Sequence, residues 1–299
     1  MTERINVSLR TDQGLVRDHN EDFVTSWEPK TTAEAEKHGW LYIVADGVGG
    51  ADAGEVASQF ASERVIAHYL ANSETKSWGE RLIRAMHSAN TDLRQLVIER
   101  DANTRMATTM VAAVVQNGQA FIGNVGDSRG YHWRNGNFRQ ITKDQSLVAK
   151  LLEEGAITEE EAEDHPHKNV ILYSIGSEAS PKIDLFHIQL EPNDIVLLCS
   201  DGLSGYVTDS EIEAIISREV PETATKQLIA LANQRGGPDN ISVGLLQITD
   251  EETQEVEVAH SATEPVAQTS QTSLLLYTIF LSLVQTALIV MVWLWLTIL

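Results

Sequence analysis

Two Asn-Gly pairs, each lying between two strand-like runs, place the strongest limit on what this chain can fold into. They are Asn117-Gly118, between residues 110–116 and 119–124, and Asn135-Gly136, between residues 130–134 and 137–142. Asn-Gly favours a two-residue turn with positive φ at both central positions, and such a turn joins antiparallel strands. Further strand-like runs occupy 40–45, 195–200 and 241–248. The sequence therefore predicts consecutive antiparallel hairpins rather than alternating strand–helix–strand units.

Helical patterns lie between these strands. In residues 80–100 the apolar positions recur every three or four residues, which indicates a helix with one apolar stripe. We also expect helices at 53–71 and 223–235. A further helix should start near Thr208, because Thr208-Asp209-Ser210-Glu211 has the capping-box pattern. Strands and helices arranged in this order predict an antiparallel α+β domain.

The C-terminal end differs from the rest of the chain. Residues 274–299 carry no charged side chain, and a helix of that length spans about 39 Å, more than the roughly 30 Å hydrocarbon core of a bilayer. We expect a transmembrane helix, because a buried helix is seldom apolar on every side over such a length. Residues 251–273 are rich in Glu, Thr, Ser and Gln and predict an acidic polar linker. No apolar signal segment follows the N-terminus, so we expect a tail-anchored protein of the inner (cytoplasmic) membrane with its main domain in the cytoplasm.

The charge balance excludes one large class of function. The chain has 43 acidic and 22 basic residues, a formal net charge of −21. A nucleic-acid-binding protein needs Lys and Arg to neutralise phosphates, so we expect no nucleic-acid partner. The single cysteine, Cys199, lies in an apolar run, which predicts a buried thiol and excludes an internal disulfide.

Four aspartates lie at the ends of strand-like runs with a glycine close by: Asp46, Asp127, Asp201 and Asp239. Taken singly, each is more often a turn aspartate that accepts backbone N–H groups. Four of them weaken that interpretation, and if they converge their mutual repulsion requires a cation. Oxygen ligands with so little His or Cys nearby indicate Mg²⁺ or Mn²⁺ rather than Zn²⁺. A backbone carbonyl such as that of Gly47 could join them, because glycine allows close approach.

Two further segments each allow two interpretations. Arg17 lies among acidic residues, and its guanidinium could hold a phosphate through paired hydrogen bonds. From this segment alone a surface ion pair is the preferred interpretation. Residues 145–180 are acidic and short-helical and interrupt the strands, so a flap beside a site and a solvated insertion fit them equally well.

Eight motifs in one order carry a resemblance to a known family. They are Gly14-Leu15-Val16-Arg17 with Asn20-Glu21-Asp22, Ala45-Asp46-Gly47-Val48-Gly49-Gly50, Ala107-Thr108-Thr109, Asn124-Val125-Gly126-Asp127-Ser128-Arg129, Asp144-Gln145-Ser146-Leu147-Val148, His165-Pro166 with Asn169-Val170, Ser200-Asp201-Gly202-Leu203, and Asp239-Asn240-Ile241-Ser242. Over about residues 5–249 the chain resembles the metal-dependent serine/threonine phosphatases of the protein phosphatase 2C type, in their bacterial form. The resemblance implies an α+β catalytic domain over residues 1–250. Its fold would be a four-layer sandwich of two antiparallel β-sheets flanked by helix layers, with residues 145–180 as the flap.

The resemblance also implies a role for each matched residue. Two Mn²⁺ or Mg²⁺ ions would be bound by Asp46, the Gly47 carbonyl, Asp201 and Asp239. Asp46 would bridge both ions and act in catalysis. Asp127 and Asp201 would form a third, weaker metal site. The residues implied to support the ligands and orient their waters are Glu21, Asp22 and Asn240. Arg17 would hold the substrate phosphate. The implied activity is hydrolysis of phosphoserine and phosphothreonine in proteins by a metal-activated water.

Phosphorylated proteins, the substrates of a Ser/Thr kinase, are the implied partners, and the C-terminal helix would tether the enzyme to the membrane. One alternative is a phosphatase of an anti-sigma-type regulatory protein. Another is a membrane-tethered pseudophosphatase that binds phosphopeptides without hydrolysing them, although the intact aspartates weigh against it. Three positions depart from the family pattern. Val48 stands where animal members carry a histidine, Gly205 where many members carry an aspartate near the third metal, and Gln145 where a histidine is common.

Overall fold

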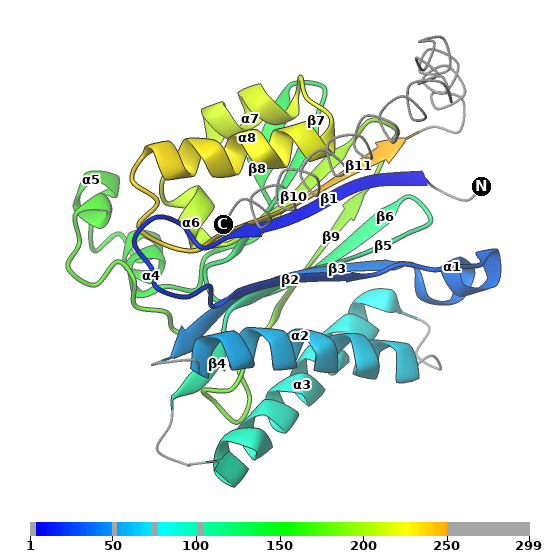
Figure 1. The fold of residues 1–299 in the computed structure, drawn as a ribbon, viewed down its shortest axis with the longest axis horizontal. Coiled ribbons are helices and arrows are strands. Elements are labelled where there is room, and N and C mark those ends of the chain that lie inside the picture. Colours follow the sequence, from blue (N-terminus) through cyan, green and yellow to red (C-terminus); the bar gives the residue numbers. More distant parts are fainter. Residues whose placement is uncertain (1–3, 50–52, 73–76, 101–104, 250–299) are drawn as a thin grey trace, which may run out of the picture. The chain divides into compact units, whose positions relative to one another are not determined.

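Eleven strands form two antiparallel sheets in the computed structural model, which describes residues 4–49, 53–72, 77–100 and 105–249. The strands are β1 (Arg4–Asp12), β2 (Asp22–Trp27), β3 (Trp40–Gly49), β4 (Met106–Thr108), β5 (Met110–Gln116), β6 (Gln119–Val125), β7 (Arg129–Arg134), β8 (Asn137–Gln140), β9 (Asp184–Gln189), β10 (Ile195–Cys199) and β11 (Ile241–Thr249). One sheet has the order β1-β11-β10-β7-β8, and the other has the order β2-β3-β5-β6-β9 with β4 paired to β3. The first and last strands of the domain therefore lie side by side (Figure 1).

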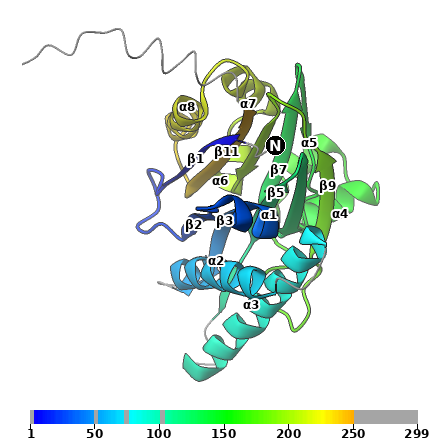
Figure 2. The same ribbon diagram turned by 90° about the vertical axis from the view of Figure 1, so that its right-hand side faces the viewer.

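Helices cover the outer face of each sheet (Figure 2). They are α2 (Ala53–Ala71) and α3 (Trp78–Arg100) on one side, and α6 (Asp201–Ser204), α7 (Asp209–Ile216) and α8 (Pro221–Gln234) on the other. Successive side chains of a strand point to opposite faces, so Ile43 of β3 packs against the helices while Val44 packs between the sheets. Likewise Leu198 of β10 faces the other sheet, and Cys199 is buried toward the helices as predicted. This alternation gives the four-layer sandwich that the resemblance implied.

Both predicted hairpins are present. Asn117 and Asn135 have φ of 49° and 50°, and the glycine after each also has positive φ. The predicted capping box at Thr208 is formed and starts α7. Helix α8 starts at Pro221, two residues before its predicted start, because proline is favoured in the first turn of a helix.

Strand β3 continues past its predicted end at residue 45 and changes partner on the way. It pairs with β5 as far as Val44 and with β4 from Gly47 onward. Between these two ladders Asp46 pairs with Asp22 at the start of β2. The sequence pattern predicts that Asp46 and Gly47 follow the strand. In the structure they lie within it, because β3 runs to Gly49. Six further elements have no counterpart among the predicted ones: β1, β2, β4, β9, α1 (Thr32–His38) and the short helix α6.

The predicted flap segment holds two short helices, α4 (Leu147–Glu153) and α5 (Glu159–Glu163), at the same end of the sheets as α6 (Figure 1). An isolated β-bridge between Ser146 and Ile171 joins the outgoing and returning segments of the flap. We call these segments, together with the residues up to Ile175, the flap stem. A second bridge ties Ile175 to Thr108 of β4. The flap segment therefore leaves the sheets and returns to them at the same place.

The predicted linker at 251–273 and the predicted transmembrane helix at 274–299 lie outside the described residues. Within the part of the chain that the structure describes, no helix is both long and apolar enough to cross a bilayer.

Candidate metal centre

Five aspartates from separate elements lie close enough to interact at the end of the sheets where α6 lies (Figure 1). Asp22 opens β2 beside Asp46 of β3, Asp127 follows β6, Asp201 opens α6, and Asp239 precedes β11. Burial raises the pKa of Asp46 well above its ordinary value, and the charges of the other four raise it further. The four aspartates selected from the sequence are thus brought together, and Asp22 is the fifth member of this aspartate cluster.

Two carboxyls of the cluster titrate near neutral pH. Burial raises the pKa of Asp22 to about 7, although hydrogen bonds from Ser242 and Ser200 lower it. The hydroxyl of Ser200 donates to Asp22 Oδ2 at 2.8 Å. Burial also raises the pKa of Asp127 to about 7, with a smaller contribution from the charge of Asp201. At physiological pH the cluster can therefore be fully ionised only if a cation offsets its charge.

Two oxygens of the cluster are buried without a hydrogen-bond partner: Asp22 Oδ1 and Asp201 Oδ1. A buried carboxylate oxygen with no partner is costly, so each of these atoms calls for a cation or an ordered water. Among the described residues, no group of three or more His, Cys, Asp or Glu side chains has the geometry to hold a metal ion. The donor set is nevertheless made of oxygens alone, which fits Mg²⁺ or Mn²⁺ and not Zn²⁺.

Glycines allow the elements around the cluster to pack backbone against backbone. A Cβ on Gly47 would lie 2.2 Å from the carbonyl oxygen of Gly54, and a Cβ on Gly54 would lie 2.7 Å from the carboxylate of Glu21. A Cβ on Gly202 would lie 1.9 Å from the carbonyl oxygen of Asn240. These close approaches hold Glu21 against the start of α2 and hold the start of α6 against the segment before β11. Burial raises the pKa of Glu21, and the nearby Arg17 opposes that rise.

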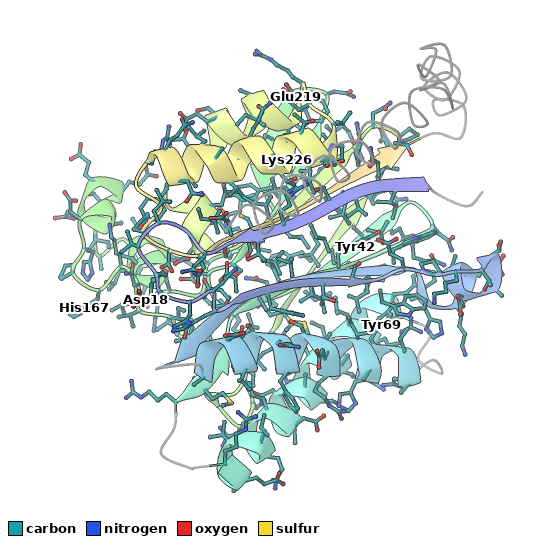
Figure 3. All side chains as sticks on the ribbon, viewed as in Figure 1. Asp18, Tyr42, Tyr69, His167, Glu219 and Lys226 are labelled. Atoms are coloured by element: carbon teal, nitrogen blue, oxygen red, sulfur yellow. The ribbon has the colours of Figure 1, made fainter. Side chains whose placement is uncertain are left out.

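Arg17 lies on the solvent side of the cluster, near Asp239 and Asp46, with its side chain half exposed. Its Nη2 donates to Asp239 Oδ2 at 2.7 Å, and this hydrogen bond raises the pKa of the guanidinium. Figure 3 shows its neighbour Asp18 at this end of the sheets, with Tyr69 toward the other end. The ion pair favoured from the sequence is thus present, and it joins Arg17 to a cluster aspartate.

Asn240 organises the loop that carries Arg17. Its Nδ2 donates to the carbonyl oxygens of Gln13 and His19 at 2.8 and 2.9 Å. Its Oδ1 accepts the backbone N–H of Glu21 at 2.8 Å. One side chain thereby ties both ends of this loop to the start of β11, which fits the supporting position expected for Asn240.

Thr108 and Gln145, for which the sequence predicts no role, join the flap to the cluster. Thr108 donates its hydroxyl to the carbonyl oxygen of Asp46 at 2.8 Å, and its backbone pairs with Ile175 of the flap stem. Gln145 accepts the N–H of Gly126 at 2.9 Å and donates to Asp184 at 2.8 Å. Both residues lie in motifs that carry the resemblance. The departure of Gln145 from the family pattern is the one sequence signal that points to a role for either residue.

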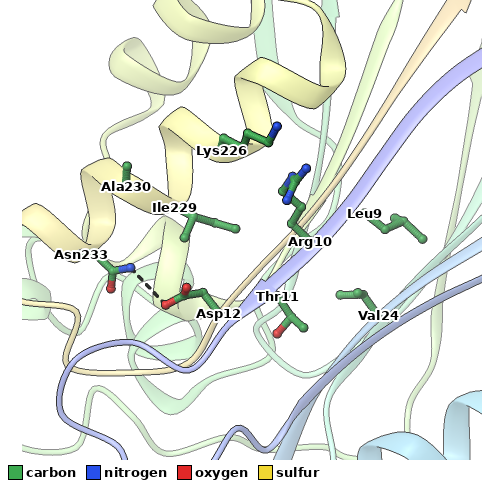
Figure 4. Close-up of a pocket in the computed structure, with 9 residues that line it drawn as sticks. All are labelled: Leu9, Arg10, Thr11, Asp12, Val24, Lys226, Ile229, Ala230 and Asn233. Atoms are coloured by element: carbon green, nitrogen blue, oxygen red, sulfur yellow. Dashed lines mark hydrogen bonds between the residues drawn. The ribbon is translucent and has the colours of Figure 1, made fainter. Parts of the chain in front are cut away.

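A separate pocket of about 530 Å³ lies between β1, β2 and α8 (Figure 4). In it, Asn233 donates to Asp12 Oδ1 at 3.0 Å. Lys226 at its rim is paired with Glu222 at 2.8 Å. No member of the aspartate cluster lines this pocket, so it is distinct from the candidate metal centre.

Comparison with known proteins gives consistent matches over this domain. A family model described as Protein phosphatase 2C matches residues 19–236. The serine/threonine phosphatase stp of Listeria welshimeri serovar 6b is 38% identical over 255 residues, which cover 81% of this chain and 96% of that protein. The solved serine/threonine phosphatase PstP/Ppp of Mycobacterium tuberculosis has a TM-score of 0.72 at 34% identity, covering 82% of this chain and 99% of its own. A PstP catalytic domain solved with two manganese ions has a TM-score of 0.70 at 34% identity and the same coverage of both chains.

Proposed function

The chain belongs to the protein phosphatase 2C family, and we propose that the aspartate cluster is its active site. This protein is a bacterial-type protein serine/threonine phosphatase that uses Mn²⁺ or Mg²⁺. The observation that carries the proposal is the convergence of five buried or half-buried carboxyls, two of which have a buried oxygen without a partner. Such a cluster costs stability unless it binds cations, which is the expected signature of a metal site.

The residues that would hold the metal ions are Asp46, the Gly47 carbonyl, Asp201 and Asp239, with Asp127 and Asp201 at a third, weaker position. When bound, divalent cations offset the carboxylate repulsion and lower the pKa of water, which supplies a nucleophile at neutral pH. Glu21 and Asp22 would accept hydrogen bonds from that water and orient it toward phosphorus. Asn240 would keep Glu21 in place through the hydrogen bond to its backbone N–H.

Arg17 would bind the phosphoryl group of the substrate. A guanidinium can donate two parallel hydrogen bonds to phosphate oxygens and stabilises the charge that builds on them in the transition state. The exposed half of its side chain leaves donors free for this contact, while Asp239 fixes its orientation. Val48, at the position where animal members carry a histidine, has no proton to donate, so the leaving serine or threonine oxygen would take its proton from water or from another residue.

The activity can be tested with the full chain in a mild detergent. We expect hydrolysis of p-nitrophenyl phosphate and of a phosphothreonine peptide with Mn²⁺ or Mg²⁺ and none with EDTA. Asp201→Asn should abolish turnover, whereas Asp209→Asn, on the exposed start of α7, should leave it unchanged. Tight phosphopeptide binding without turnover, by folded and metal-loaded protein, would contradict the proposal and favour a binding module.

We further propose that residues 274–299 anchor the enzyme in the cytoplasmic membrane and that the domain faces the cytoplasm. The uncharged sequence of this segment supports the proposal. Its substrates would be phosphoproteins made by a Ser/Thr kinase. Cell fractionation tests the anchor, because the full chain should pellet with membranes and a chain ending at residue 272 should not. A full chain that stays in the supernatant without detergent would overturn the anchor and leave the phosphatase assignment intact.

A further inference from the structure

Two adjacent apolar side chains are exposed on the loop that carries Arg17. The exposed fraction is 69% for Leu15 and 66% for Val16. A third large apolar residue, Tyr206, is 38% exposed just after α6. Single exposed apolar side chains are ordinary, but three around one functional residue require an explanation.

Hydrogen bonds to the backbone hold the two segments that carry these side chains close to Arg17 and Asp239. The N–H of Leu15 donates to the carbonyl oxygen of Gly237 at 2.7 Å, two residues before Asp239, the partner of Arg17. On the other side, Arg235 donates to the carbonyl oxygen of Tyr206 and so holds the segment that follows α6. Burial raises the pKa of the Tyr206 hydroxyl, and the charges of Asp201, Asp239 and Arg17 also act on that pKa, which places this side chain near the cluster. Leu15, Val16 and Tyr206 therefore flank the solvent side of the aspartate cluster on two different segments, and we call them the apolar rim.

We propose that the apolar rim binds the side chains next to the phosphorylated residue of a protein substrate and selects apolar ones. The inference rests on the proposed function, because it takes Arg17 as the phosphate-binding residue. When the phosphoryl group lies at Arg17, the neighbouring substrate residues must pass over the solvent side of the cluster, since successive residues of an extended chain advance only about 3.3 Å.

The charge of the enzyme disfavours acidic neighbours of the phosphoresidue, and the exposed apolar side chains of the rim are what favour apolar ones. Acidic side chains next to the phosphoresidue would meet a protein of net charge −21 and the carboxylates of the cluster, so they should be disfavoured. Apolar side chains avoid this repulsion and bury the surface of the rim. Burying one leucine side chain completely is enough for about a tenfold gain in affinity.

Two phosphothreonine peptides test the proposal with the full chain in detergent and Mn²⁺. One has leucine at the two positions on each side of the phosphothreonine, and the other has serine there. We expect kcat/KM to be about tenfold higher for the leucine peptide, mainly through a lower KM. The double variant Leu15→Ser/Val16→Ser and the single variant Tyr206→Ser should each reduce this preference. Ile98→Ser, which removes an equally exposed side chain from α3, should keep it.

The serine peptide is the internal reference, because its turnover reports the chemistry of the site in every variant. Equal kcat/KM for the two peptides in the wild-type enzyme would overturn the role of the rim and leave the phosphatase assignment standing. A preference that survives in both rim variants would overturn it as well. If neither peptide is hydrolysed with any metal, the proposed function fails, and this inference fails with it.

Discussion

The guanidinium of Arg17 and the carboxylate of Asp239, 222 positions apart in the sequence, form an ion pair with 2.7 Å between Nη2 and Oδ2. The other carboxylate oxygen of Asp239 accepts the backbone N–H of Asn240 at 2.9 Å. Asn240 in turn holds the loop from which Arg17 projects. The proposed phosphate-binding residue and a proposed metal ligand are therefore positioned by one hydrogen-bonded unit.

Arg17→Lys should reduce activity because an ammonium group cannot donate two parallel hydrogen bonds to a phosphate. We expect kcat/KM for p-nitrophenyl phosphate to fall by about ten- to a hundredfold, the loss of one or two charge-assisted hydrogen bonds. Steady-state kinetics with saturating Mn²⁺ measure the change. Arg10→Lys, which alters an exposed pair with Glu222, is the matched control. An unchanged kcat/KM for Arg17→Lys would show that Arg17 does not bind the phosphate.

The metal-free protein should lose stability as pH rises from 6.5 to 8. Asp22 and Asp127 have pKa values of about 7 in the folded chain, far above their ordinary value, so the folded state binds protons that the unfolded state has already lost. This contribution is lost as pH rises through about 7, on the order of 1 kcal/mol for each carboxyl. His38, whose pKa burial lowers, opposes the trend only below its ordinary value of about 6.5.

Thermal unfolding in EDTA at the two pH values measures the effect, and Asp127→Asn should reduce it. Mn²⁺ added at pH 8 should raise the Tm, because the ion binds the ionised cluster of the folded state alone. Asp209→Asn serves as the control for a change of surface charge. A Tm that does not fall between pH 6.5 and 8 in EDTA would contradict the raised pKa values.

Gly202→Ala should disrupt the site through the backbone. The added Cβ would lie 1.9 Å from the carbonyl oxygen of Asn240, so α6 and the segment before β11 must move apart. We expect a loss of about 2 kcal/mol in the free energy of unfolding, as in other overpacked sites. Mn²⁺ affinity, measured by calorimetry, should also fall because Asp201 and Asp239 separate. Ser204→Ala in the same helix should change neither quantity by a comparable amount.

Gln145→Ala should loosen the connection between the flap stem and the loop before Asp127. The variant leaves the N–H of Gly126 without its acceptor, and a lost buried hydrogen bond costs about 1–3 kcal/mol. Hydrogen exchange should become faster at Gly126, and kcat/KM should fall with it. Gln140→Ala removes an amide bonded to Asp144 and should leave the Gly126 amide protected. Unchanged exchange at Gly126 would show that Gln145 does not hold this loop.

The part of the fold that local turn and helix chemistry determines could be predicted from the sequence. Asn-Gly turns require positive φ at residues where few others tolerate it, and the capping box at Thr208 marks a helix start by itself. Helix α8 begins two residues before its predicted start, at Pro221, because proline is favoured in the first turn of a helix. Edge and short strands such as β1, β2 and β4 could not be predicted, since their pairing depends on partners far along the chain.

The candidate site was predicted residue by residue rather than as a geometry. The aspartates could be selected because each lies next to a strand and a glycine. That Asp46 lies inside a strand could not be seen, because β3 exchanges β5 for β4 through tertiary pairing. Nor did the sequence reveal that Ser200 donates to Asp22, a contact between residues 178 positions apart.

The pairing of β1 with β11 has a consequence for how the enzyme is made. Asp12, at the end of β1, pairs with Ile241, so the loop that carries Arg17 is held by the last strand of the domain to be synthesised. A nascent chain released before that strand would lack Asn240 and the partner of β1. Translation must therefore reach the end of β11 before any phosphatase activity can exist. Truncated products of this gene should be inactive rather than weakly or promiscuously active.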